Sequence, residues 1–130
     1  MKKIIITNNP KVYENYCNKM DIMYSETYTY LDVLSKARDK IHEGHNLLTH
    51  PLSGSVKPNE TPYKSLAISI ECGSLDMNSL MIIEESIATA RKFITGKKTP
   101  HWTERILEDF QMIDYYLIKS GIESMDQFHE

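Results

Sequence analysis

The chain opens with a run of β-branched residues that most constrains its fold: Lys2-Lys3-Ile4-Ile5-Ile6-Thr7. Apolar and polar residues do not alternate in this run, which is typical of a strand covered on both faces, as in a parallel sheet. Asn8-Asn9-Pro10 follows at once. Asn9 can cap a helix through its side-chain oxygen, and Pro10 suits the first helical position. A doubly covered strand that leads directly into a helix predicts an α/β fold.

The later segments continue this alternation. Short apolar runs predict further strands, and capping signals with helical periodicity predict four helices. The last helix carries Trp102, Ile106, Phe110, Ile113 and Leu117 on one face and is expected to stop at Gly121. We therefore expect one α/β domain over 1–130, with a small, mostly parallel sheet of about four strands, Ile4 to Ile6 on a central strand, helices on both faces and a frayed tail at 122–130. The predicted strands are 2–7, 21–25, 45–49 and 65–71, and the predicted helices are 10–20, 30–43, a helix ending at Gly96, and 102–120.

Charge and composition exclude several classes of protein. The 130 residues hold 15 Lys and Arg against 18 Asp and Glu, a net charge of −3 at pH 7, which removes the main argument for a nucleic-acid partner. The sequence contains no apolar run near eighteen residues and no signal-peptide pattern, so we expect no membrane partner. Two cysteines suit a reducing compartment. We expect a cytoplasmic protein, with a homo-oligomer left open.

Residues 50–64 have neither helical nor strand periodicity and contain three prolines and a glycine. An uninterrupted loop of this length is unusual in a small domain and tends to be functional or disordered. If all strands are parallel, this loop, Thr7-Asn8-Asn9 and Glu71-Cys72-Gly73-Ser74 share the carboxyl edge of the sheet, where ligands collect in open α/β folds.

The loop has the groups that an anion site needs. Ser53, Gly54 and Ser55 can present backbone N–H groups and hydroxyls, and Lys57 adds an ammonium. The glycine spacing is not that of a Walker loop or a dinucleotide fingerprint. We predict an ordered loop with an anion-binding concavity that faces Asn8 and Asn9; the alternative is a structural cover whose serines satisfy its own turns. The candidate ligand-binding residues are Asn8, Asn9, His50, Ser53, Gly54, Ser55, Lys57, Asn59, Glu60 and Lys64.

Three neighbouring histidines invite a metal interpretation. His42 lies in the last turn of a predicted helix, His45 beyond its cap and His50 beyond a predicted strand. The three side chains would have to converge across extended chain, and no cysteine accompanies them. We expect no metal site and no cofactor.

The loop and its flanks also carry a family signature. It reads Leu47-Leu48-Thr49-His50-Pro51-Leu52-Ser53-Gly54-Ser55-Val56-Lys57-Pro58-Asn59-Glu60-Thr61-Pro62-Tyr63-Lys64-Ser65, and it closely resembles the GrdX family. Similar flanks are Ile5-Ile6-Thr7-Asn8-Asn9-Pro10, the helix from Val33 to Gly44, and Leu107-Glu108-Asp109-Phe110-Gln111. That family is associated with the glycine, sarcosine and betaine reductase system of anaerobic amino-acid-fermenting bacteria.

The resemblance implies a context for the protein. The family has no assigned reaction, so no catalytic residue is carried over. The reductase system makes acetyl phosphate through selenol and thiol chemistry, but this chain has no Cys-x-x-Cys pair, which disfavours a redox-carrier role. The resemblance therefore implies an accessory protein that binds a small anionic metabolite or a reductase subunit through residues 50–64.

Two rival hypotheses remain open. The first is an enzyme for a phosphorylated or amino-acid-derived molecule, with His50 or Glu60 as general acid or base and Lys57 as an electrostatic clamp. The second is a structural or dimerisation module with the loop in a subunit interface.

Overall fold

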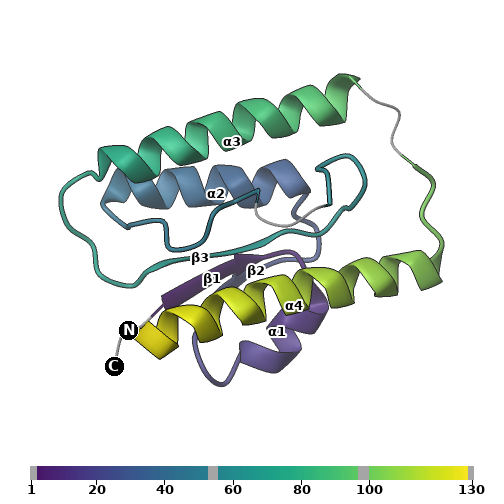
Figure 1. Ribbon diagram of the computed structural model, residues 1–130, viewed down its shortest axis with the longest axis horizontal. Helices are drawn as coiled ribbons and strands as arrows, with labels where there is room; N and C mark the ends of the chain where they lie inside the picture. The colour runs from purple at the N-terminus through teal and green to yellow at the C-terminus, as the bar shows by residue number, and fades with distance from the viewer. Residues whose placement is uncertain (1–2, 53–55, 97–99, 129–130) are drawn as a thin grey trace.

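The fold is α/β, with a three-stranded sheet and four helices in the part of the chain that the structure describes (Figure 1). The structure is a computed structural model, which describes residues 3–52, 56–96 and 100–128. The elements are β1 (Lys3–Thr7), α1 (Pro10–Tyr16), β2 (Asp21–Tyr24), α2 (Tyr30–Glu43), β3 (Ser65–Ser69), α3 (Met77–Gly96) and α4 (Glu104–Phe128).

The sheet is mixed, with strand order β2-β1-β3. β1 is central, as predicted for Ile4 to Ile6. It pairs parallel with β2 and antiparallel with β3, where Ile5 lies opposite Ala67 and Thr7 opposite Ser65. About four mostly parallel strands are therefore not confirmed. Because β3 runs against β1, its first residues lie beside the carboxyl end of β1, and residues 71–74 lie at the opposite edge of the sheet. The predicted meeting of 71–74 with Asn8 and Asn9 is wrong.

The predicted strand at 45–49 is also wrong, since only Leu47 forms an isolated bridge, to Ile68 of β3. Two backbone hydrogen bonds of a ladder form, from the N–H of Leu48 to Ala67 O and from the N–H of Ser69 to Asn46 O, but side-chain hydroxyls take other backbone N–H groups here. The N–H of Asn46 donates to Ser69 Oγ, the N–H of Leu47 donates to Ser79 Oγ, and Thr49 Oγ1 accepts from the N–H of Ala67. Hydroxyl groups that compete for the backbone in this way prevent a regular strand.

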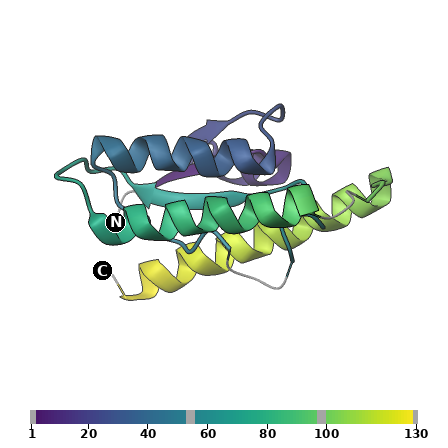
Figure 2. The same ribbon diagram turned by 90° about the horizontal axis from the view of Figure 1, so that it is seen from above.

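Helices cover both faces of the sheet, as predicted (Figures 1 and 2). On one face, Ile6 packs against the apolar stripes of α2 and α3, which run side by side. On the other face, Ile5 packs with Val12 of α1 and with Ile118 and Ile122 of α4. The two adjacent isoleucines thus reach opposite cores, because successive side chains of a strand point to opposite faces.

Capping residues set the starts of α1 and α2 where the sequence predicts them. Asn9 Oδ1 accepts from the N–H of Lys11, and Pro10 is the first helical residue. Thr29 and Asp32 form a capping box at the start of α2. α1 ends at Tyr16, earlier than predicted, so that Cys17 lies past the buried face and is exposed.

α4 is longer than predicted and presents a different face. It continues through Gly121 to Phe128, so the expected stop at Gly121 is wrong and residues 122–128 are helical. Its buried residues are Asp114, Ile118 and Ile122, whereas Ile113 is 42% exposed. Hydrogen bonds from the sheet end hold Asp114, which turns the 114–118–122 face inward. None of the helices within the described ranges has the length and apolar character of a membrane span.

Candidate functional site

A chain of buried hydrogen bonds joins the end of β1 to the start of β3. The N–H of Asn9 donates to Thr7 Oγ1 (2.9 Å), and Thr7 Oγ1 lies 2.6 Å from Ser65 Oγ. Ser65 Oγ in turn donates to Asp114 Oδ2 on α4, also at 2.6 Å. Because the Ser65 proton is used on Asp114, the hydroxyl of Thr7 donates to Ser65. Each bond polarises the next, so the chain fixes these side chains in one arrangement.

Asp114 is the acceptor at the end of this chain. Besides Ser65 Oγ, the N–H of Ser65 donates to its Oδ1 (3.1 Å), and Asn9 Nδ2 donates to its Oδ2 (3.0 Å). Burial raises the pKa of Asp114 above its ordinary value of 3.8, against the opposing effect of these hydrogen bonds and of the nearby Lys64. Three donors therefore satisfy a carboxyl group that has almost no access to solvent.

Lys64 is the second buried ionisable group, with only 6% of its surface exposed. Its Nζ lies 5.9 Å from the centre of the Tyr30 ring. Within the described ranges, no hydrogen bond and no ion pair holds its ammonium, in contrast to the carboxyl group of Asp114. Burial lowers the pKa of Lys64, and the charge of Asp114 opposes that effect.

Lys64, Ser65 and Asp114 line a cavity of about 290 Å³ between α4 and the segment that ends at His50. The N–H of Leu52 donates to His50 Nδ1 (3.1 Å), so the neutral imidazole carries its proton on Nε2. Thr49 Oγ1 accepts from Ala67 and keeps its own hydroxyl proton as a donor. The polar part of the lining is therefore rich in donors. The other lining residues are Leu48, Leu117, Ile118, Gly121, Ser124 and Met125.

Asn8 holds the end of the predicted loop against β1. Its Oδ1 accepts from the N–H of Lys64 (2.9 Å), and its Nδ2 donates to the carbonyls of Pro62 (2.8 Å) and Tyr28 (3.0 Å). The side-chain amide of Asn9 is likewise engaged, with Gln111 O and Asp114. Both asparagines thus position the site, and their side chains already have protein partners.

The remaining predicted residues that the structure describes are absent from the lining of the Lys64 cavity. Lys57 is exposed, and its Nζ lies 5.8 Å from the centre of the Phe93 ring. The carboxylate of Glu60 accepts from the N–H of Lys57 (3.2 Å). Asn59 lines a separate cleft of about 460 Å³, which Asn8 also reaches. Ser53, Gly54 and Ser55 lie outside the described residues, and their role stays a prediction.

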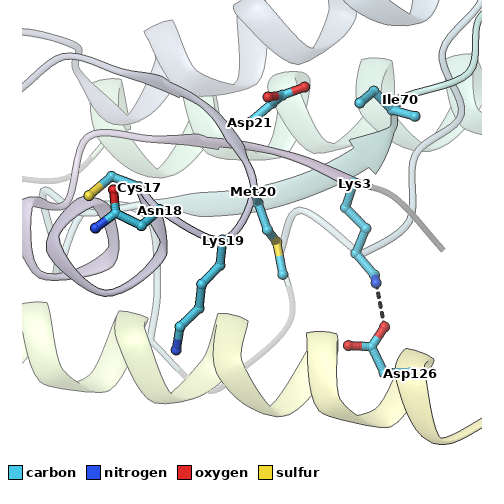
Figure 3. A pocket seen from close by; sticks show the side chains of 8 residues that line it. All are labelled: Lys3, Cys17, Asn18, Lys19, Met20, Asp21, Ile70 and Asp126. Carbon is cyan, nitrogen blue, oxygen red and sulfur yellow. Dashed lines mark hydrogen bonds and ion pairs between the residues drawn. The ribbon is translucent and has the colours of Figure 1, made fainter.

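A third cleft, of about 520 Å³, lies at the other end of β1 (Figure 3). Lys3 of β1 and Asp126 of α4 point toward one another across it and form an ion pair. Met20, Cys17 and Lys19 extend along its wall from the turn after α1. Because the ammonium of Lys3 is already paired with Asp126, we assign this ion pair a structural role that ties the end of α4 to the sheet.

A comparison of the sequence with models of known protein families identifies one family. The family model for GrdX-like protein matches residues 4–123, which include Lys64, Ser65 and Asp114. The chain belongs to the GrdX-like family. No curated protein and no solved structure matches it in the corresponding searches. The match covers both the predicted loop and the helix that closes the cavity from the other side.

Sequence reasoning missed three residues of this GrdX-like site: Thr7, Ser65 and Asp114. Asp114 left a signal, since it stands four residues before Ile118 and eight before Ile122, a helical spacing that places a carboxylate on an apolar face. A carboxylate at such a position needs buried donors. Thr7 and Ser65 left none, because their pairing depends on the antiparallel register of β3.

Two of the three neighbouring histidines, His45 and His50, have protein partners. His45 Nδ1 lies 2.7 Å from Ser69 O, and His50 Nδ1 accepts from Leu52. Across the described ranges, no group of three or more His, Cys, Asp or Glu side chains is placed to hold a metal ion.

Proposed function

We propose that this GrdX-like protein binds a small anionic molecule in the Lys64 cavity. The observation that carries the proposal is Lys64, a buried residue in the cavity lining whose ammonium has no hydrogen-bond or ion-pair partner among the described residues. A buried charge is costly unless a counter-charge or hydrogen bonds compensate it. A carboxylate or phosphate group in the cavity would supply that partner. By favouring the charged form of Lys64, it would also offset the effect of burial on the pKa of the amine.

The other polar groups of the cavity support an anion over a cation. His50 Nε2–H and the hydroxyl of Thr49 are donors. Asp114 is the one carboxylate in the lining, and its two oxygens already accept three hydrogen bonds. An incoming anion could therefore accept hydrogen bonds from His50 and Thr49. The carboxylate of Asp114 takes its own hydrogen bonds from the protein.

The family supplies a biological setting for the proposal. The resemblance to proteins of the glycine, sarcosine and betaine reductase system suggests that the anion is a metabolite of that system. We propose an accessory role there, in the cytoplasm, where the two exposed thiols, Cys17 and Cys72, stay reduced. Acetyl phosphate, acetate and inorganic phosphate are the first probes, because they carry the anionic groups that Lys64 would bind.

A thermal-shift comparison tests the proposal. Any probe that binds only the native state raises its melting temperature. We expect at least one of the three probes to raise the melting temperature of the wild type by several degrees and to leave Lys64→Met unshifted. Lys57→Ala is the matched control, since it removes an exposed lysine of the same segment, and it should respond as the wild type does. Equal shifts in the wild type and Lys64→Met, or no shift with any probe, would contradict the proposal.

The position of His50 favours one form of the enzyme hypothesis. His50 lines the same cavity as Lys64, whereas Glu60 does not. If the bound molecule reacts, His50 is therefore the candidate general acid or base, and Lys64 takes the clamp role first given to Lys57. Turnover of acetyl phosphate that is lost in His50→Gln, with binding retained, would support catalysis. Saturable binding without product would support a binding protein.

A further inference from the structure

A second cleft opens on the other side of the loop end, and its walls are aromatic. It has a volume of about 460 Å³ and lies between the start of α2, residues 58–63 and the residues that lead into α4. Tyr28, Tyr30, Tyr63 and Trp102 line it. Its size falls within the range of pockets for small molecules, and its lining is mostly apolar, with few polar groups.

Hydrogen bonds fix the aromatic walls of this cleft. Trp102 Nε1 donates to Glu60 O (3.0 Å), and Tyr63 Oη accepts from Gln111 Nε2 (2.8 Å). The amide of Asn8 holds the carbonyls of Tyr28 and Pro62, so both sides of the cleft are tied to the end of β1. A site whose walls are already ordered loses little conformational entropy when a ligand binds.

One buried acceptor of the cleft lacks a donor within the described ranges. Asn59 Oδ1 is buried and has no hydrogen-bond partner in the described part of the chain. The carboxylate of Glu26 also lines the cleft. A ligand that brings an N–H group could donate to either acceptor. The buried oxygen of Asn59 would gain more than the carboxylate of Glu26, because an unpaired buried acceptor is costly.

Two of the four rings, those of Tyr28 and Tyr30, already face an ammonium group. Lys36 Nζ already lies 5.7 Å from the centre of the Tyr28 ring, and Lys64 Nζ lies 5.9 Å from that of Tyr30. The two ammonium groups already form cation–π interactions with these rings. A flat neutral ring, in contrast, can stack on an aromatic wall and still offer a donor at its edge.

We propose that this cleft is a second ligand site, which takes a flat, neutral heteroaromatic ring with an amino group. The ring stacks within the aromatic walls, and the amino group donates to Asn59 Oδ1. Among the described residues, none lines both this cleft and the Lys64 cavity, so the two proposals are tested with different variants.

The single tryptophan of the chain gives a direct test, because Trp102 is part of the wall. Adenine and purine are matched probes, since they differ only in the exocyclic amino group. We expect adenine to quench the Trp102 fluorescence saturably, and purine to bind about tenfold more weakly because it leaves Asn59 Oδ1 unpaired. Absence of saturable quenching by adenine, or equal affinities for the two probes, would overturn the proposal without any variant.

Two variants assign the discrimination to Asn59. Asn59→Leu should bind adenine about as weakly as the wild type binds purine, a loss of about tenfold. Lys57→Ala, two residues away and exposed, should keep the wild-type preference for adenine. A preference for adenine that survives in Asn59→Leu would contradict the assigned hydrogen bond.

Discussion

Asp114 connects three segments that are far apart in the sequence. It receives hydrogen bonds from Asn9 at the end of β1 and from two groups of Ser65 at the start of β3, while itself belonging to α4. The charge of its carboxyl group also raises the pKa of buried Lys64, against the effect of burial. Removal of this one side chain would leave several buried donors without an acceptor. It would also remove the negative charge that offsets the effect of burial on the Lys64 ammonium.

We therefore predict that Asp114→Ala lowers the free energy of unfolding by about 3 kcal/mol or more, because unpaired buried polar groups keep their full desolvation cost. Asp114→Asn keeps one acceptor oxygen and should lose less. Urea denaturation measures both. A loss below about 1 kcal/mol in Asp114→Ala would show that the neighbours of Asp114 find other partners.

Lys64 predicts a pH dependence of stability. Burial lowers its pKa below the ordinary value of 10.5, so that at alkaline pH the unfolded chain binds more protons than the folded protein. Stability then rises with pH over the window between the folded and unfolded pKa values. We expect the wild type to gain stability relative to Lys64→Met as the pH rises from neutral toward 10.5.

Denaturation curves of both proteins at several pH values measure this difference. Taking the difference removes the effect of the tyrosines, which both proteins share. A difference that stays constant from about pH 7 to about pH 10 would mean that Lys64 titrates as an exposed lysine does.

At the scale of helices, two glycines differ in whether the backbone requires them. Gly44 ends α2 with φ +114°. A Cβ at this position would collide with the carbonyl of Gly73, because the N–H of Gly73 donates to Gly44 O and holds the two residues close together. Gly121 lies inside α4, where a Cβ would meet only the methyl group of Thr49, at 3.4 Å. The first position needs a glycine; the second tolerates one at a cost in helix propensity.

We predict that Gly44→Ala lowers the free energy of unfolding by about 2 kcal/mol or more, through the positive φ and the collision with Gly73. Gly121→Ala should instead leave it unchanged or raise it by up to about 1 kcal/mol. Thermal denaturation of the pair measures both effects. The account of α4 would be contradicted if Gly121→Ala were the more damaging change.

The helices were more predictable than the strands, because helix caps act locally whereas strand pairing depends on distant residues. Asn9, Pro10, Thr29 and Asp32 act locally, and their capping roles could be predicted from the sequence. The segment 45–49 has the composition of a strand, but hydroxyls of the distant residues Ser69 and Ser79 accept from two of its backbone N–H groups. No local pattern reveals such competitors.

At the scale of the whole molecule, the antiparallel pairing of β3 decides which residues meet. It brings Lys64 and Ser65 beside Asn8 and Asn9 and moves residues 71–74 to the far edge. Of the predicted site residues, His50 and Lys64 line the Lys64 cavity, and Asn9 donates to the carboxyl group of Asp114 in its wall. Lys57 was predicted from its charge and its place in the 50–64 loop; it is exposed and lies over Phe93, away from the cavity.

The central claim is that the buried amine of Lys64 is the anion-binding group, and an NMR titration with inorganic phosphate tests it most directly. The signals of the lysine ε-carbons are followed, with those of Lys64 and Lys57 identified from the spectra of Lys64→Met and Lys57→Ala. The account predicts that the Lys64 signal shifts and saturates while the Lys57 signal changes little. An unchanged Lys64 signal, or parallel unsaturated drifts of both lysines, would contradict it.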